Sequence, residues 1–272
     1  VDFDQGAYEG VKTEFRDFAM KLDVADLTFI PVSALRGDNI VERSLNTPWY
    51  EGTSLLHHLE EVHIASDRNL IDARFPVQYV IRPQSDDHHD YRGYAGTVAG
   101  GVFKPGDEVM VLPSGFTTTI ASIDTFDGPV DEAFPPMSVT IRLTDDLDVS
   151  RGDMICRPHN QPTAGQDIEA MVCWMSESTS LVPRMKLAVK HTTRSARVMV
   201  TDLQYRIDVN TLHRDDSATS LGLNEIGRVS LRCTHPLFFD EYRRNRTTGS
   251  IVLVDEVTNA TVAAGMILGG VR

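Results

Sequence analysis

Cysteine is scarce in this 272-residue chain, and the three that are present lie far apart. Cys156, Cys173 and Cys233 form no pair with the spacing of a redox or zinc motif, which argues against a disulfide-stabilised or metal-stabilised domain. Long apolar runs are also lacking, and none approaches the roughly 18 residues that suggest a membrane-spanning helix. We therefore expect a cytoplasmic protein with reduced cysteines and no membrane partner.

Positive charge is in deficit. The chain has 39 acidic and 26 basic side chains, a formal net charge of -13. The deficit lies in residues 1–163, which hold 27 acidic and 13 basic side chains, whereas residues 164–272 hold 12 and 13. An acidic surface repels the phosphate backbone of nucleic acid, so we expect no nucleic-acid partner.

Two motifs of nucleotide-binding proteins are missing as well. There is no Gly-x-x-x-x-Gly-Lys-Ser/Thr sequence, whose backbone amides cradle phosphates, and no Asn-Lys-x-Asp sequence, which selects guanine. We expect no catalytic residue in the chain as given, and no nucleotide hydrolysis by it alone.

Short β-type segments are abundant from residue 74 onward. They are rich in Val, Ile, Thr and Tyr and are bounded by Gly, Pro, Asp and Ser, a pattern typical of small barrels. Lys104-Pro105-Gly106-Asp107 predicts a tight turn, since Pro fixes φ and Gly accepts a positive φ. A polar, Pro-containing stretch at 157–163 separates two sets of six predicted strands, at 75–81, 93–101, 108–112, 117–124, 137–143 and 154–157, and at 167–175, 185–191, 196–205, 228–233, 250–255 and 261–268.

The first 67 residues have a different pattern. Apolar residues at helical spacing predict a first helix over 8–22, and Thr53 or Ser54 is a suitable N-cap for a second. We expect that second helix to bury Leu55, Leu56, Leu59 and Val62. Between the helices, residues 27–32 (LTFIPV) predict one buried strand. An α/β domain cannot be built on a single strand, so we interpret residues 1–67 as the C-terminal part of a larger domain.

Three segments resemble a known family. They are RGYAGTVAGGVFKPGDEVMVLPSG (92–115), SLVPRMKLAVKHTTRSARVMV (180–200) and CTHPLFFDEYRRNRTTGSIVLVDEVTNATVAAGM (233–266). The chain resembles the GTPase subunit of bacterial sulfate adenylyltransferase, a branch of the elongation-factor-type GTPases, over almost all of residues 24–268. The resemblance implies a mainly β fold: two consecutive antiparallel β-barrels of the translation-factor type, at 68–162 and 163–272, preceded by the α/β C-terminal remnant of a P-loop GTPase domain at 1–67.

The function that this resemblance implies is regulatory. In that family, GTP hydrolysis is coupled to the synthesis of adenosine 5′-phosphosulfate from ATP and sulfate by a small catalytic subunit. GTP and Mg²⁺ would be cofactors of the complete protein and not of this chain alone, and some members carry an adenosine-phosphosulfate kinase fused after the second barrel. Two alternatives stay open: a translational GTPase that carries aminoacyl-tRNA, and a non-catalytic binding module.

Ser33, Ala34 and Leu35 are the candidate binding residues. They match, in position and order, the family loop whose backbone donors meet the guanine carbonyl, and they form a partial base-binding site. A downstream segment, WYEGTSLL (49–56), also resembles the family.

Two other clusters have ordinary explanations. Residues 86–90 (Asp-Asp-His-His-Asp) imitate a metal site, but adjacent residues seldom all face one ion, so we expect a solvated loop and no metal. Lys186, Lys190 and Arg194 would share one face if a single strand ran through them, and 243–246 (RRNR) predicts a basic turn. For both we favour a solvated surface over an RNA contact, because no aromatic platform accompanies the charges.

Overall fold

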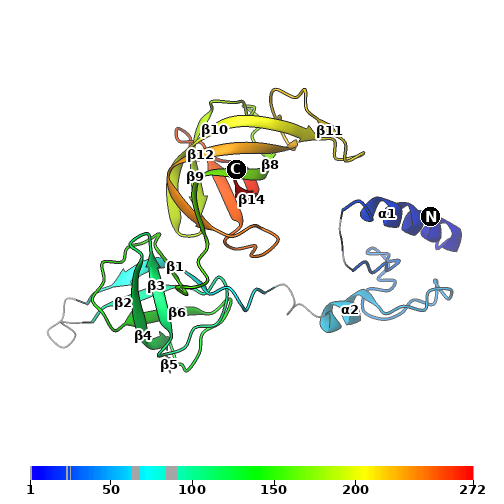
Figure 1. Cartoon of the computed structure of the whole chain (residues 1–272). Coiled ribbons are helices and arrows are strands. Elements are labelled where there is room, and N and C mark those ends of the chain that lie inside the picture. The colour runs from blue at the N-terminus through cyan, green and yellow to red at the C-terminus, as the bar shows by residue number, and fades with distance from the viewer. Residues whose placement is uncertain (1, 23, 25, 63–67, 84–90, 272) are drawn as a thin grey trace. The chain divides into compact units, whose positions relative to one another are not determined.

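The computed structural model describes residues 2–22, 24, 26–62, 68–83 and 91–271. The chain divides into two compact units, Val1–Asp67 and Arg68–Arg272. Of the elements in the described residues, the helices lie in the first unit and the strands in the second (Figure 1).

Both helices of the first unit begin at side chains that cap them. In α1 (Gln5–Ala19), the Asp4 carboxylate accepts a hydrogen bond from the Ala7 N–H at 2.6 Å. In α2 (Leu55–Glu61), the Ser54 hydroxyl accepts from the His57 N–H, which confirms one of the two expected N-caps. Each cap satisfies a backbone donor that the first helical turn leaves free.

Two expectations for this unit are wrong. Residues 27–32 form no strand, and no strand in the described part of the unit lies beside them to supply hydrogen-bond partners. Helix α2 buries none of its residues, and Leu59 is 61% exposed. The apolar spacing correctly predicted a helix. Its apolar side chains are not buried, because burial requires neighbouring elements that the described part of residues 1–67 does not contain.

The first barrel follows from residue 74. Its strands are β1 (Arg74–Ile81), β2 (Gly93–Thr97), β3 (Glu108–Leu112), β4 (Phe116–Thr125), β5 (Gly128–Pro129), β6 (Ser138–Leu143) and β7 (Met154–Cys156). They pair antiparallel in the order β3-β7-β1-β2-β6-β4, and a further β3–β4 pairing closes the ring. The predicted turn after Lys104 is confirmed, because Gly106 has φ +90° and the Asp107 N–H donates to the Lys104 carbonyl at 3.1 Å. Fully buried Phe75 and Phe103 pack edge to face in the core.

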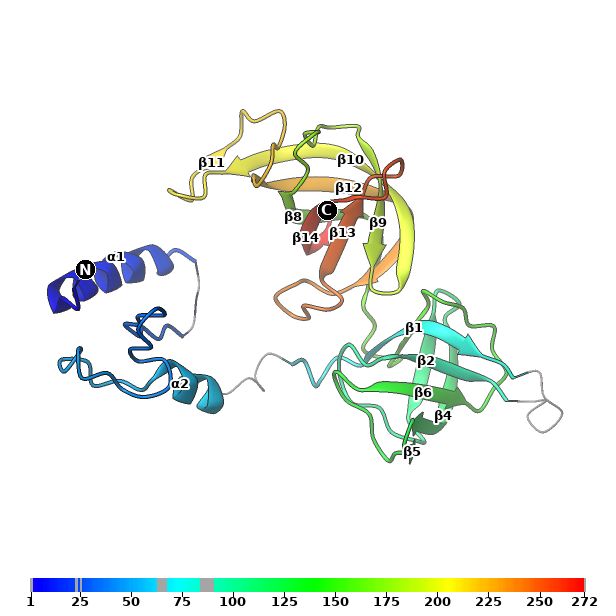
Figure 2. The ribbon, with the colours of Figure 1, turned by 180° about the vertical axis from the view of Figure 1, so that it is seen from behind.

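The second barrel has longer strands. They are β8 (Thr163–Trp174), β9 (Lys186–His191), β10 (Arg194–Ile207), β11 (Arg214–Asp215), β12 (Ile226–Phe239), β13 (Ser250–Val254) and β14 (Thr261–Gly270). The order β10-β12-β8-β14-β13-β9, closed by β10–β9, gives a second antiparallel ring (Figures 1 and 2). Trp174, Leu231 and Leu253 are among the side chains that are completely buried inside this ring. The predicted fold class, mainly β with two antiparallel barrels, is confirmed.

An ion-pair network joins the two barrels, and of its charged side chains only that of Arg244 is exposed. Arg74, 1% exposed, donates from Nε and Nη2 to both carboxylate oxygens of Asp240, at 2.9 and 2.8 Å. Its remaining nitrogen, Nη1, donates to the backbone and side chain of Asn160. Arg244 makes a second two-point contact, with Asp72, at 2.6 Å for each bond. Arginine–carboxylate pairs with this parallel geometry are directional, so they constrain how the chain segments of the two barrels meet at this joint.

Candidate functional site

Ser33 opens a tight turn in the N-terminal unit. The Ser33 N–H donates to the Asp38 carbonyl at 3.2 Å, and the Ser33 carbonyl accepts from the Gly37 N–H at 2.8 Å. The Ser33 hydroxyl accepts from the Arg36 N–H at 3.3 Å. Gly37 has φ +79°, a conformation that costs glycine little, and it lets the chain reverse after Arg36.

Ala34 and Leu35 form the apex of this turn, and both are exposed, Leu35 to 96%. Within the described residues, the backbone N–H groups of Ala34 and Leu35 donate to no protein acceptor. The structure therefore brings the three predicted site residues together in one turn and leaves two adjacent backbone donors open to solvent. Such donors are suited to an acceptor oxygen on a ligand.

Asn39 holds the turn from behind, and the sequence reasoning did not single it out. Its side chain is fully buried, its amide nitrogen donates to the Pro31 carbonyl at 2.8 Å and to the Thr47 hydroxyl at 2.9 Å, and its oxygen accepts from the Ser44 N–H. Asn39 has φ +55°. The Gly37-Asp38-Asn39 sequence contained the signal, since asparagine tolerates the left-handed region better than most residues do.

Asp38 lies beside the same turn with an incomplete set of partners. Its Oδ1 accepts hydrogen bonds from the Ser44 hydroxyl and from the Asn46 side chain. These bonds hold the pKa of the Asp38 carboxyl below its usual value. The other oxygen, Oδ2, is buried and has no hydrogen-bond partner in the described part of the chain.

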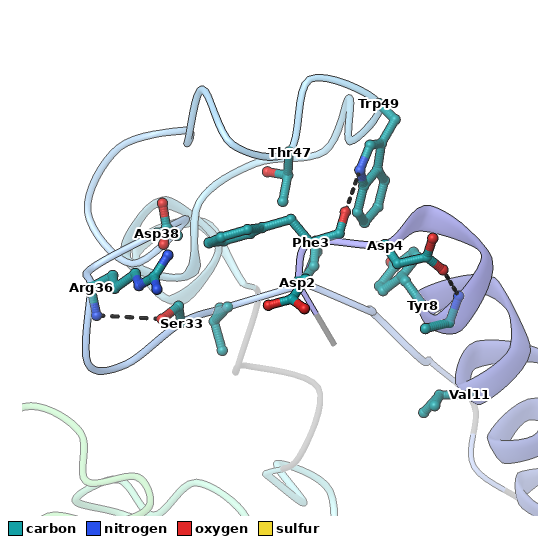
Figure 3. A pocket seen from close by; sticks show the side chains of 13 residues that line it. Asp2, Phe3, Asp4, Tyr8, Val11, Ser33, Arg36, Asp38, Thr47 and Trp49 are labelled. Atoms are coloured by element: carbon teal, nitrogen blue, oxygen red, sulfur yellow. Dashed lines mark hydrogen bonds between the residues drawn. The ribbon is translucent and has the colours of Figure 1, made fainter.

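A pocket of about 440 Å³ lies next to the turn (Figure 3). Ser33, Arg36 and Asp38 line it on the turn side, and Phe3, Tyr8 and Trp49 are among the residues that line the rest. The Trp49 Nε1–H donates to the Phe3 carbonyl at 3.0 Å, and the Tyr8 and Trp49 rings lie 5.1 Å apart. Ala34 and Leu35 are not part of the lining.

Several arginines of the second barrel are paired with carboxylates. Arg228 and Arg232 on β12 pair with Glu169 and Asp167 on the neighbouring strand β8. The predicted basic turn is present and its arginines are exposed, as expected; Arg244 in addition pairs with Asp72. Lys186 and Lys190 are exposed on β9 as expected, but that strand ends at His191 and Arg194 begins another.

Two further possibilities were a metal site and a membrane-spanning helix. Residues 86–90 lie outside the described residues. In the part of the chain that the structure does describe, no group of three or more His, Cys, Asp or Glu side chains is placed to hold a metal ion. No helix among those same residues has the length and apolar character needed to cross a membrane.

Known proteins share both the sequence and the fold. Residues 167–268 match the family model described as GTP-eEF1A C-terminal domain-like. The bifunctional enzyme CysN/CysC of Mycobacterium tuberculosis is 60% identical over 98% of this chain and 44% of its own length. Sulfate adenylyltransferase subunit 1 of Bacteroides fragilis is 47% identical over 100% of this chain and 56% of its own length. The chain thus spans about half the length of the curated relatives it matches.

Among solved structures, Sup35 complexed with GDP superimposes with a TM-score of 0.68 at 20% identity, covering 100% of this chain and 67% of that one. At that identity the likeness concerns the fold alone. At 44–60% identity, the sequence of this chain is similar to those of sulfate adenylyltransferase subunit 1 and the bifunctional enzyme CysN/CysC over nearly its whole length.

Proposed function

We propose that the chain is part of a regulatory GTPase subunit of sulfate adenylyltransferase. That subunit would couple GTP hydrolysis to the synthesis of adenosine 5′-phosphosulfate from ATP and sulfate by a small catalytic subunit, in the cytoplasm. The observation that carries the proposal is the 47% identity to sulfate adenylyltransferase subunit 1 along the entire chain. Adenylylation of sulfate is strongly uphill, and a linked conformational cycle shifts it only as far as the GTP and GDP states differ in their interactions with the partner.

Three domains follow from this proposal. Residues 1–67 are the C-terminal part of a GTPase domain, residues 68–162 are its first barrel and residues 163–272 its second. The exposed apolar side chains of α1 and α2, such as Phe15 and Leu59, support the first assignment, because a complete α/β domain would give them strands to pack against. The name "bifunctional enzyme" of the M. tuberculosis relative supports a second activity on one polypeptide, and we infer an adenosine-phosphosulfate kinase after the second barrel in such relatives.

Ser33, Ala34 and Leu35 would contact the guanine base. The two open N–H groups at Ala34 and Leu35 fit the carbonyl oxygen of guanine, and the Asn39 contacts hold the turn that presents them. The residues present thus fit the base end of GTP, and the sequence supplies no P-loop for its phosphates or Mg²⁺. We therefore expect no useful GTP affinity and no hydrolysis by this chain alone. Calorimetry with GTP and Mg²⁺ tests this, and tight binding would show it to be wrong.

A protein partner is favoured over tRNA. The acidic first 163 residues repel phosphate, and the arginines of β12 are already paired with carboxylates. Co-purification of the chain with the small sulfate-adenylylating subunit, set beside filter binding to tRNA at physiological salt, separates the two functions. Retention of the subunit supports the proposal. Micromolar or tighter tRNA affinity without retention of the subunit would favour the translational alternative.

A further inference from the structure

Phe126 is the most exposed aromatic side chain in the described part of the first barrel. It lies in the two-residue turn between β4 and β5, where Thr125 pairs with Gly128, and it is fully exposed. Tight turns favour Gly, Asn, Asp and Pro for reasons of backbone geometry, and phenylalanine offers none of these advantages. Phe126 also takes no part in the hydrophobic core of the barrel. Folding therefore gives no reason for a large apolar group at this position.

A concave surface lies beside this turn. A hollow of about 400 Å³ is lined by Phe126 from the hairpin, Tyr79 from β1, and the backbone and hydroxyl groups of β2 and β6. Tyr79 is 66% exposed, and it too is absent from the core. The Thr97 and Ser138 hydroxyls, 3.2 Å apart, contribute to the lining. Isolated exposed apolar residues are common on proteins, but two aromatic side chains at one hollow form a surface that suits a partner.

The hairpin side of the hollow is acidic. Asp124 lines the hollow and Asp127 adjoins Phe126 in the turn, and among the described residues neither is within ion-pair distance of a basic side chain. Arg151 is the one basic residue in the lining, and its guanidinium donates to the Gln78 carbonyl at 3.0 Å. Residues 68–162 as a whole hold 14 acidic and 8 basic side chains. Asp127 is exposed, and Asp124, which is half-buried, accepts a hydrogen bond from the Ser122 hydroxyl at 3.2 Å. Carboxylates without an ion-pair partner attract a basic surface and repel phosphate.

We propose that Tyr79, Phe126 and the carboxylates of Asp124 and Asp127 form a docking surface, here the Phe126 surface, for a protein that presents an apolar socket flanked by lysine or arginine. The proposal rests on the proposed function in one respect: it takes the small catalytic subunit as the occupant. Phe126 enters the socket and loses water, as central aromatic residues of interfaces do, and the carboxylates orient the basic rim. The aromatic pair could also stack nucleotide bases, but the carboxylates beside it oppose an RNA backbone.

The test compares two exposed phenylalanines of the same barrel. Phe126→Ala and Phe116→Ala each remove a largely exposed ring, at opposite ends of β4, and Phe116, 62% exposed, does not line the hollow. Binding of the small subunit to the 272-residue chain is measured by biolayer interferometry, and tRNA binding is measured in parallel. We expect Phe126→Ala to weaken binding of the subunit about tenfold or more, and Phe116→Ala to change it less than about twofold. Both variants should keep the melting temperature of the unchanged chain, because neither ring supports the core.

A charge variant sharpens the test. Asp127→Lys should slow association, and the slowing should shrink as salt is added, because exposed charges steer encounter and salt screens them. Subunit binding that is equal in the unchanged chain and in Phe126→Ala overturns the docking surface and leaves the proposed function standing. Failure of the unchanged chain itself to bind the subunit overturns both. Binding of tRNA that is lost in Phe126→Ala overturns the protein partner and assigns the surface to RNA.

Discussion

The two units of the chain treat apolar side chains in opposite ways. In the N-terminal unit, α1 buries only Ala19 of its own residues and α2 buries none, although both helices are capped. In the barrel unit, two clusters enclose side chains such as Phe75, Trp174 and Phe239 with almost no exposed area. The difference shows that capping and apolar periodicity are enough to form a helix locally, whereas burial depends on which elements lie around it.

The largest expected effect tests this contrast directly. Phe239→Ala removes a ring that is 1% exposed and should lower the free energy of unfolding by about 3–5 kcal/mol. Phe15→Ala removes a ring from α1 that is 48% exposed, and it should cost less than about 1 kcal/mol. Urea unfolding followed by circular dichroism measures both. Equal losses for the two variants would contradict the contrast.

The next largest effect is expected at the joint between the barrels. Arg74→Ala leaves the buried Asp240 carboxylate without its main partner and should destabilise the barrel unit by about 3–5 kcal/mol. The double variant Arg74→Met with Asp240→Leu removes both charges, so it should cost much less than Arg74→Ala. A double variant as unstable as the single one would mean that packing, and not the unpaired charge, determines the loss. Thermal unfolding of the three proteins distinguishes these outcomes.

A smaller effect, also confined to the barrel unit, is pH dependence from His191. The ring is buried, and its Nε2–H donates to the Thr248 carbonyl at 2.7 Å. Burial lowers the pKa of His191 below its ordinary value, so the unfolded chain binds the proton more readily than the folded one does. Stability should therefore fall as the pH drops below about 6.5, by at most about 1.4 kcal/mol per pH unit.

The control for His191 is His191→Gln, whose amide N–H keeps a donor toward Thr248 but does not titrate. It should flatten the slope between about pH 7 and 5, measured by urea unfolding at each pH. A second loss is expected below about pH 4, because the Arg244 guanidinium lowers the pKa of Asp72 and that carboxylate must be protonated in acid. An unchanged slope in His191→Gln would assign the pH dependence above pH 5 to other groups.

The smallest effect belongs to the N-terminal unit. Ser54→Ala removes the N-cap of α2 and its hydrogen bond to the Val41 carbonyl, at a cost of about 1 kcal/mol. Ser54→Thr keeps the hydroxyl and should lose less. Hydrogen exchange should show faster opening of α2 in Ser54→Ala only. If exchange also accelerated in the strands of the barrels, the two units would not be energetically separate.

The strands could be predicted because local patterns, namely apolar alternation and the turn residues on either side, mark where each strand begins and ends. Residues 108–112 were predicted as a strand and β3 spans the same residues, bounded by the Lys104–Asp107 turn on one side and by Pro113 on the other. Strands β10 and β12 are longer than predicted. Their ends extend into polar segments such as Thr234-His235-Pro236, where the alternation that marks a strand is lost.

The candidate site could be predicted only in part. Ser33, Ala34 and Leu35 were found by their resemblance to a family loop. The buried contacts of Asn39 with Pro31 and Thr47 could not be read from spacing, because they join segments eight residues apart through side-chain hydrogen bonds. The fully exposed Phe126 gave no signal either, since a phenylalanine in a β-rich segment is expected to be buried.

By itself, then, the sequence determined the β-rich composition, the turns, the N-caps and the likeness to sulfate adenylyltransferase subunit 1. These depend on local backbone preferences and on residue order, which a linear pattern records. Tertiary structure alone decided which apolar residues are buried, which arginine meets which carboxylate, and that Arg74 and Asp240, 166 positions apart, close the joint between the barrels. Such contacts form between residues that are far apart in the sequence, and local backbone preferences do not specify which distant segments meet.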